Sequence, residues 1–435
     1  MSSVRVRSLS FVAALALVGA LAPTAADASN DALWARQYGP AQIQAPSAWT
    51  VTRGDDVIIA VVDSGVDVEH PDLRDKLLVL PGSDFGDNDD NPDDDSDTED
   101  GSGKKVKGHG THVAGIAGAI TDNGEGIAGV APRSVIMPVK VFGSSQENIA
   151  LAATRISRAI SFAVNNGAKV VNLSLGTLQG VNLVGLLETP CTDALLRGAL
   201  CIVAAGNAGN QPSGYDRDFN GVIVTANDSD GRHAAFGQHA DTKWALSAPG
   251  VSILSTFPVE DGAYASLPGT SMAAPHVAGV AALLFSQGMG PEDVAEKLVG
   301  TADQMPDRRV NGAGRVNAAR AVGAPVAVPQ VEDPTVDEAG DGPDPAAGGP
   351  SGGGGGLGPG GRLIDDVPVV LEDLDDEALG ANDDLGFELA GETEVQARRS
   401  GVEIEDRVVW VYLAILTLLT VLIGWTAVFR RSRRT

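Results

Sequence analysis

Three short segments of the sequence carry side chains that could together activate a hydroxyl group. Asp63 follows a run of β-branched residues, His109 lies between two glycines, and Ser271 opens an apolar segment. Each also has an ordinary interpretation, as a turn acid, a surface histidine and a serine that caps a helix. A serine hydroxyl is a poor nucleophile unless a neighbouring base takes its proton. The function therefore depends on whether the fold brings acid, base and hydroxyl together.

The segments around these residues predict a parallel sheet covered by helices. Continuous apolar runs, typical of strands buried on both faces, occur at 57–62, 134–141, 168–175, 200–205 and 222–226. Helices are expected at 109–119, 148–165, 192–199 and 271–287. Their alternation predicts an α/β fold of three layers, a parallel sheet with helices on both faces, in which ligands bind outside the carboxyl ends of the strands.

The sequence around the three residues resembles the subtilisin family of serine proteases. The resemblance rests on Asp63-Ser64-Gly65, Gly108-His109-Gly110-Thr111-His112 and Gly269-Thr270-Ser271-Met272-Ala273, in that order. Connecting sequence at 126–132 and 171–176 resembles the family as well, and the similarity extends over about residues 31–322. It implies a subtilisin-like fold and a serine endopeptidase that acts on polypeptides, with a monomeric catalytic domain and no catalytic cofactor.

The resemblance also implies roles for individual residues. Ser271 would attack the scissile carbonyl, His109 would take the proton of Ser271, and Asp63 would hold the imidazole in position. Asn207, in the segment 203–209, matches the asparagine of the family's oxyanion hole. Its amide would donate to the developing oxyanion together with the Ser271 backbone N–H.

We expect substrate to bind as an extended strand between two segments of the cleft, with specificity set by side-chain pockets. The residues that match the family's substrate segments are Lys140, Val141, Phe142, Gly143, Ser174, Leu175 and Gly176. Gly214 is the candidate for the floor of the first pocket, and a glycine there would admit large apolar side chains.

Two groups of oxygen ligands predict structural calcium. Residues 84–100 contain ten acids, among which Asp84, Asp87 and Asp89 have the short spacing that calcium loops use. The alternative is a solvated acidic insertion. The second group consists of Asp72, Asp122 and Asn123, and it matches in part a calcium site of the family.

The charge of the chain excludes one class of partner. The formal net charge of −26 argues against nucleic acid as a partner, because phosphate binding needs a basic surface.

Residues 1–28 read as a signal peptide, with two arginines, an apolar run and a small-x-small cleavage site. The peptidase domain is expected at 29–323 and a Pro/Gly-rich, acidic linker at 324–407.

The C-terminal sequence predicts a membrane anchor. Residues 408–429 form an uncharged segment long enough to span a bilayer as a helix, and residues 430–435 contain four arginines. The arginines place the tail in the cytoplasm and the catalytic domain outside. The alternative is a sorting segment that is later removed. The layout, with an anchor and no room for a folded prodomain, resembles that of the mycosins.

One further prediction concerns the two cysteines. Cys191 and Cys201 are expected to remain free thiols, because a helix at 192–199 would separate them beyond the ~7 Å limit for a bridge.

A catalytically silent peptide-binding scaffold is a competing function, which the presence of all four active-site residues opposes. Peptide ligation through the same acyl-enzyme is a third candidate function. Hydrolysis is the default expectation, because water is in excess.

Overall fold

The computed structural model describes residues 29–326, except for 97–104, 144–148, 176, 179–180 and 183. The predicted signal peptide, the predicted linker beyond residue 326 and the predicted segments 408–429 and 430–435 lie outside the described residues. Within the described part, no helix combines the length and apolar character needed to cross a membrane.

A six-stranded parallel sheet forms the centre of the domain, in the order β2-β1-β3-β6-β7-β8. Its strands are β1 (Ile58–Asp63), β2 (Val135–Lys140), β3 (Val170–Leu173), β6 (Leu200–Ala204), β7 (Val222–Asn227) and β8 (Ala245–Pro249). Nearly all of their side chains are buried, as expected of strands covered on both faces. The sequence predicted strands at the positions of β1, β2, β3, β6 and β7 but missed β8.

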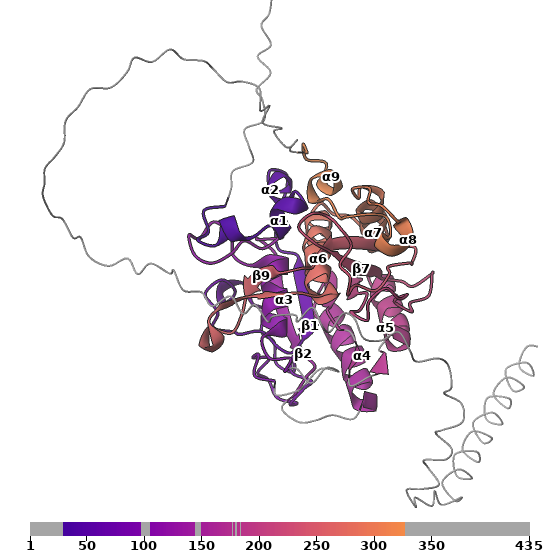
Figure 1. The fold of residues 1–435 in the computed structure, drawn as a ribbon. Coiled ribbons are helices and arrows are strands. Elements are labelled where there is room, and N and C mark those ends of the chain that lie inside the picture. Colours follow the sequence, from indigo (N-terminus) through magenta and orange to yellow (C-terminus); the bar gives the residue numbers. More distant parts are fainter. Residues whose placement is uncertain are drawn as a thin grey trace, which may run out of the picture. The chain divides into compact units, whose positions relative to one another are not determined.

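Helices cover both faces of the sheet, and two separate apolar clusters fill the spaces between the layers. On one face α3 (His109–Gly118) packs against α6 (Thr270–Phe285), and on the other α4 (Ile149–Asn165) packs against α5 (Val184–Leu196) (Figure 1). The three-layer α/β fold predicted from the sequence is therefore confirmed for the described residues.

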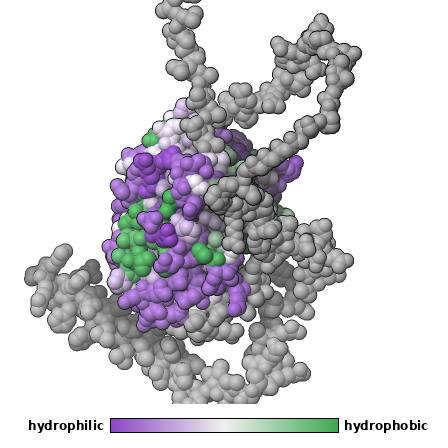
Figure 2. Space-filling model, turned by 90° about the vertical axis from the view of Figure 1, so that its left-hand side faces the viewer, coloured by the Kyte–Doolittle hydropathy of each residue, from purple (hydrophilic) through white to green (hydrophobic). Residues whose placement is uncertain are grey.

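Shorter elements complete the domain around these layers. They are the helices α1 (Gly39–Gln42), α2 (Ala45–Ala48), α7 (Pro291–Gly300), α8 (Arg308–Asn311) and α9 (Ala318–Val322), and the antiparallel pairs β4 (Thr177–Leu178) with β5 (Val181–Asn182) and β9 (Ile253–Thr256) with β10 (Tyr264–Leu267). Polar side chains cover most of the face seen in Figure 2, with smaller hydrophobic areas among them.

Helix α6 is the most deeply buried helix that the structure describes. Every residue from Thr270 to Leu284 is buried, and the helix packs against β1, β3, β6, β7 and β8 as well as α3. A helix that is apolar and small-residue-rich all round belongs in a core rather than at a surface. The segment that begins with Ser271 is thus held by almost the whole sheet.

The two cysteines form a disulfide, so the prediction of free thiols is wrong. Cys191 and Cys201 have Cα atoms 5.7 Å apart, and both are fully buried. Helix α5 begins at Val184 rather than at residue 192, and it contains Pro190. Cys191 therefore lies within the helix, and the chain turns back after Leu196 so that β6 brings Cys201 beneath it.

Candidate active site

Asp63 and His109 form a close pair where β1 ends and α3 begins. His109 Nδ1 lies 2.7 Å from Oδ1 of Asp63, whose side chain is fully buried, while the imidazole is about a quarter exposed. The same carboxylate oxygen accepts the backbone N–H of Ser64 at 2.7 Å. Because an ionised carboxylate only accepts, Nδ1 carries the proton of the neutral ring, and Nε2 is the nitrogen that can act as a base.

A glycine allows this close approach of helix and strand. A Cβ on Gly110 would lie 2.1 Å from the carbonyl oxygen of Gly65 and 3.0 Å from Cβ of Asp63. Any side chain at this position would therefore push the first turn of α3 away from the end of β1. The separation of Asp63 and His109 depends on the absence of a side chain at residue 110.

Ser271 is the second residue of α6, and its hydroxyl faces the end of β3. Ser271 Oγ lies 3.3 Å from the carbonyl oxygen of Ser174, and the residue is 9% exposed. Pro275 has no N–H to donate to the Ser271 carbonyl four residues earlier, so this carbonyl needs another donor. Ser174 Oγ donates to it at 2.7 Å. The proline and Ser174 together fix the backbone around the nucleophile candidate.

Asn207 lies on the exposed loop after β6, beside the N-terminus of α6. Its Oδ1 accepts the N–H of Thr270 at 2.9 Å and the hydroxyl of Thr270 at 3.0 Å. With the oxygen held in this way, the amide group presents Nδ2 on its other side. A Cβ placed on Gly269, where φ is +149°, would lie 3.5 Å from the Ser271 nitrogen and 3.7 Å from Asn207 Nδ2. Two N–H donors therefore border one small space.

The arrangement can carry out nucleophilic acyl transfer. A buried carboxylate orients an imidazole, a helix-held hydroxyl lies on the neighbouring helix, and two donors are preorganised for negative charge on oxygen. Such donors act most strongly where charge develops in the transition state. All these groups lie at the carboxyl edge of the parallel sheet, as predicted for a ligand site of this fold.

The predicted substrate segments differ in where they lie. Ser174 is buried against Ser271, Leu175 is buried in the apolar cluster on the α4–α5 side, and Gly176 lies outside the described residues. The four residues Lys140, Val141, Phe142 and Gly143 are also buried, and the backbone of the first two pairs internally. Lys140 N–H donates to Ser83, its carbonyl accepts from Phe85, and Val141 N–H donates to Asp63.

The assignment of Lys140 to the substrate cleft is therefore corrected, whereas those of Val141, Phe142 and Gly143 stay predictions. Both main-chain groups of Lys140 already pair with the segment 83–85, so this residue cannot pair with an added strand. Gly214 is exposed with φ of +84°, and its role as a pocket floor stays a prediction.

The acidic loop that follows Ser83 surrounds a lysine. Lys140, 1% exposed, directs its ammonium group at Asp87 Oδ2 (2.8 Å), Asp84 Oδ2 (3.6 Å) and the carboxylate of Asp95. Burial opposes the charge, but hydrogen bonds to Asp87 and Asp95 outweigh it and raise the pKa of Lys140. Asp89 is exposed and accepts the N–H of Asn91.

Asp84, Asp87 and Asp89 therefore do not fit the predicted calcium site. A cation that belongs to the chain already lies against two of the carboxylates, and Asp89 faces away into solvent. Among the residues that the structure describes, no group of three or more acidic, histidine or cysteine side chains is arranged to hold a metal ion. The acidic loop is held by an internal ion cluster.

The second predicted calcium group is divided between two environments. Asp72 is fully buried and accepts Asn123 Nδ2 at 2.8 Å, Ile127 N–H at 2.9 Å and the Tyr264 hydroxyl at 3.0 Å. Burial raises the pKa of Asp72, and these hydrogen bonds offset only part of the effect. Asp122 instead forms an ion pair with Arg53 at 2.7 Å.

Asp31, which the sequence analysis did not single out, belongs with Asp72 and Asn123. It is buried, and its carboxylate accepts the backbone N–H groups of Asn123 (3.0 Å) and Asp122 (3.1 Å). Two buried carboxylates thus flank Asn123, whose side chain also offers an oxygen. This donor set fits the hard-oxygen preference of calcium, whereas Asp122 is directed away towards Arg53.

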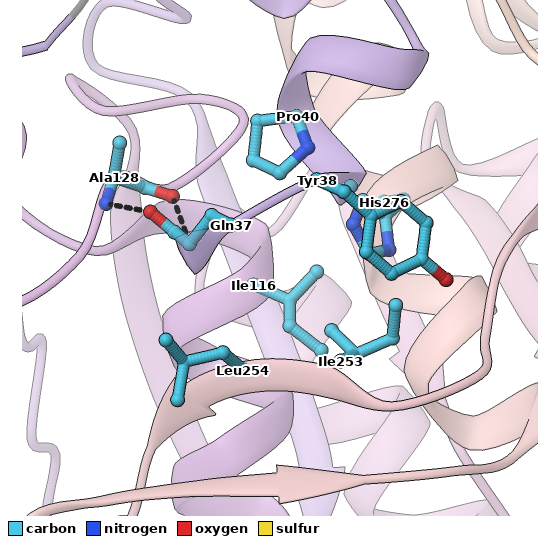
Figure 3. Close-up of a pocket in the computed structure, with 9 residues that line it drawn as sticks. Gln37, Tyr38, Pro40, Ile116, Ala128, Ile253, Leu254 and His276 are labelled. Carbon is cyan, nitrogen blue, oxygen red and sulfur yellow. Dashed lines mark hydrogen bonds between the residues drawn. The ribbon is translucent and has the colours of Figure 1, made fainter. Parts of the chain in front are cut away.

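A small pocket lies apart from these groups (Figure 3). Its volume is about 10 Å³, and the nine residues that line it include Gln37, Tyr38 and His276 but no residue of the candidate active site. Gln37 is fixed by two hydrogen bonds to the backbone of Ala128. The pocket has room for about one water molecule, so it is not where a polypeptide binds.

Comparisons with known proteins agree with this arrangement. The Subtilase family model matches residues 54–324. Thermitase from Thermoactinomyces vulgaris is 41% identical over 292 residues, which cover 66% of this chain and 96% of thermitase. Subtilisin Savinase from Lederbergia lenta is 36% identical over 287 residues, with coverage of 65% and 96%.

A solved protease structure from Pseudoalteromonas arctica has 28% identity and a TM-score of 0.57, and the match covers 68% of this chain and 99% of that one. A family match over more than half of the chain, together with a relative matched almost from end to end, decides the assignment. The chain belongs to the subtilase family and is a subtilisin-like serine endopeptidase.

Proposed function

We propose that Ser271 is the nucleophile that forms an acyl-enzyme with a polypeptide substrate, His109 its general base and Asp63 the group that orients His109. The observation that carries this proposal is the 2.7 Å contact between His109 Nδ1 and Asp63 Oδ1, since it leaves Nε2 as the basic nitrogen. Asn207 Nδ2 and the Ser271 N–H stabilise the oxyanion.

Incubation with a casein-type substrate and a serine-directed phosphonate tests these roles. We expect casein cleavage that the phosphonate stops, and a phosphonate adduct on the peptide that contains Ser271. An adduct on another serine, or casein cleavage that persists in Ser271→Ala, would contradict the assignment. Product masses separate hydrolysis from ligation of peptides.

Substrate binds in this proposal as an extended strand along Ser174, Leu175 and Gly176. Ser174 lies against the Ser271 hydroxyl, so a chain that pairs with this segment brings its carbonyl to the nucleophile. Replacement of Leu175 by Pro adds a bulky ring where the segment must pair. A variant that still cleaves extended peptides with an unchanged KM would contradict this mode of binding.

The protein is exported and stays tethered to the membrane. The buried Cys191–Cys201 disulfide supports export, because disulfides persist in oxidising compartments. A cleavable signal at 1–28 and an anchor at 408–429, followed by four arginines, give this topology. Fractionation of cells that carry the full chain or a chain without 408–435 tests it. Release of the full chain into the medium with its C-terminal tail intact would contradict the anchor.

Structural calcium binds in this proposal at Asp31, Asp72 and Asn123. The buried carboxylates of Asp31 and Asp72 on either side of Asn123 support it, and the role of the ion is to hold the N-terminal segment against the 122–127 loop. The full chain in the Ser271→Ala form should unfold at a lower temperature after chelation. The same measurement on Asp31→Asn should show little response to chelator, and an equal response in both proteins would rule the site out.

A further inference from the structure

One buried acid near the active site takes no part in the triad. Asp94 is 3% exposed and comes from the acidic loop, thirty residues after Ser64 in the sequence. Its Oδ1 accepts the hydroxyl of Ser64 at 2.8 Å, and its Oδ2 accepts both the N–H (3.0 Å) and the hydroxyl (2.6 Å) of Thr111. One carboxylate thus contacts the residue after Asp63 and the residue two after His109.

The contact continues through Ser64 to the helix. Ser64 Oγ accepts the N–H of Gly110 at 2.9 Å, and the Ser64 N–H donates to Asp63 Oδ1 at 2.7 Å. Ser64 therefore bonds to the carboxylate of the triad candidate with one atom and to the first turn of α3 with another. Because the Ser64 hydroxyl donates to Asp94, its oxygen is held where it can accept the Gly110 N–H.

Helix α3 also lacks a cap of its own. The residue before it is Gly108, which has φ of +86° and no side chain that could accept the free N–H groups of the first turn. Asp94 accepts the Thr111 N–H in its place, and a hydrogen bond from the Gly108 backbone reaches it as well. Burial raises the pKa of Asp94 to about 6, so at neutral pH the group is the acceptor that these donors need.

We infer that Asp94 is a positioning residue for the protease reaction. It binds the end of β1 to the first turn of α3 and so sets the geometry between the Asp63 carboxylate and the His109 ring. Because all four atoms that it contacts belong to residues within two positions of Asp63 or His109, loss of its charge should loosen that pair rather than the substrate cleft.

Asp94→Asn in the full-length protein tests this role. The variant keeps the shape of the side chain and removes its charge. Asp93→Asn on the same loop is the matched control, since the Asp93 carboxylate accepts from the backbone N–H groups of Val68 (3.3 Å) and Asp94 rather than from Ser64 or Thr111. We expect kcat per phosphonate-titrated site to fall roughly 10- to 100-fold in Asp94→Asn with KM within about twofold of wild type. The low-field proton resonance of His109 Nδ1 should shift in Asp94→Asn and stay in place in Asp93→Asn.

Two Ser64 variants keep the inference testable if Asp94→Asn does not fold. Ser64→Ala removes the hydroxyl that joins Asp94 to Gly110, so kcat should fall in the same direction, whereas Ser64→Thr retains the hydroxyl and should recover most of the activity. A wild-type value of kcat per titrated site in Asp94→Asn would overturn the inference, even if the melting temperature falls. If Asp94→Asn does not fold, the same result in Ser64→Ala would overturn it.

Discussion

Lys140 Nζ lies 2.8 Å from Asp87 Oδ2, and the lysine side chain is almost completely buried. Asp84 and Asp95 also face this ammonium group, so three carboxylates of one loop share a single internal cation. The loop continues into Asp94, next to the active site. The ion cluster therefore connects the end of β2 with the segment that supports the first turn of α3.

Replacement of Lys140 by Met should destabilise the domain, because the carboxylates around it would lose the cation that they share. Removal of one partner of a buried ion pair costs about 3–5 kcal/mol. Urea unfolding in the Ser271→Ala background measures the free energy, with Lys169→Met on the exposed surface as the control. Millimolar calcium should restore part of the loss in Lys140→Met alone. A variant as stable as the control would show that the cluster contributes nothing.

Replacement of Ser271 by Ala should abolish proteolysis and leave the fold intact. The side chain that is lost makes one long hydrogen bond, at 3.3 Å, so little stability depends on it. In subtilisin itself the loss of the nucleophile lowers kcat by about 10⁶-fold, and a similar fall is expected here. Casein cleavage and circular dichroism of the same sample check both parts. Normal secondary structure with normal activity would remove Ser271 from the mechanism.

Asn207→Asp should lower kcat with little change in KM. The variant keeps the oxygen that binds Thr270 and removes the Nδ2 donor that, like the Ser271 nitrogen, borders the space beside Gly269. The loss of one oxyanion donor costs about 10²–10³ in kcat, a figure measured on subtilisin. Steady-state kinetics with a peptide substrate measure it. Asn210→Asp, three residues further along the loop, is the control, and equal effects in both variants would point to loop charge rather than a lost donor.

The strands of the sheet and the helices that cover it could be predicted from sequence, because the residue patterns that identify them lie within short segments. Strands such as β1 are continuous β-branched runs, and the helix that contains Ser271 is apolar throughout, so period and composition identify both. Helix α5 was predicted at 192–199, but it spans Val184–Leu196 and contains Pro190, a residue that helix interiors disfavour. That single error separated Cys191 from Cys201 and produced the wrong prediction of free thiols.

The site details that sequence missed depend on contacts between distant segments. Lys140 resembles a cleft residue by its position, but its side chain turns to an acidic loop 45–56 residues earlier in the chain. Asp94 is one of ten acids in that loop, and nothing in the local sequence distinguishes it from Asp93. Asp31 likewise meets Asn123 only in the folded domain. The signal that could have found Lys140 is its place at the end of a buried strand, where a charge needs a partner.

Acidification should destabilise the domain in part through His276. Burial lowers the pKa of His276 to about 4, a shift that its hydrogen bond to the Met272 carbonyl only partly offsets, whereas the unfolded value is about 6.5. Between these values the unfolded state binds the proton and the folded state does not. The contribution to stability is therefore complete above pH 6.5 and is lost as the pH falls towards 4.

Urea unfolding at pH 7 and pH 4.5 measures this effect. In Ser271→Ala the free energy of unfolding should fall with pH, and in Ser271→Ala/His276→Gln the fall should be smaller, because one proton-binding group of the unfolded state is gone. Equal pH dependence in both proteins would contradict the role of His276.

Loss of the disulfide should lower stability and leave catalysis almost unchanged. The bridge closes a loop of sequence separation 10 on the α4–α5 side of the sheet, away from Ser271. A cross-link of such a short loop contributes about 2–3 kcal/mol in the chain-entropy model. Unfolding of Cys191→Ala/Cys201→Ala against wild type measures it, and a thiol reagent should find no free thiol in the denatured, unreduced wild type. Two free thiols would contradict the bridge.

The burial of α6 has a consequence for when activity appears. This helix begins beside Ser271, packs on five strands of the sheet and ends at Phe285, near the end of the peptidase domain. Ser271 therefore takes its place beside Ser174 only after most of the domain has been synthesised and has packed around this helix. Contacts of such large sequence separation form late in folding. A chain in which α6 has not yet packed on the sheet contains Asp63, His109 and Ser271 but not their folded arrangement, so we expect it to have no proteolytic activity.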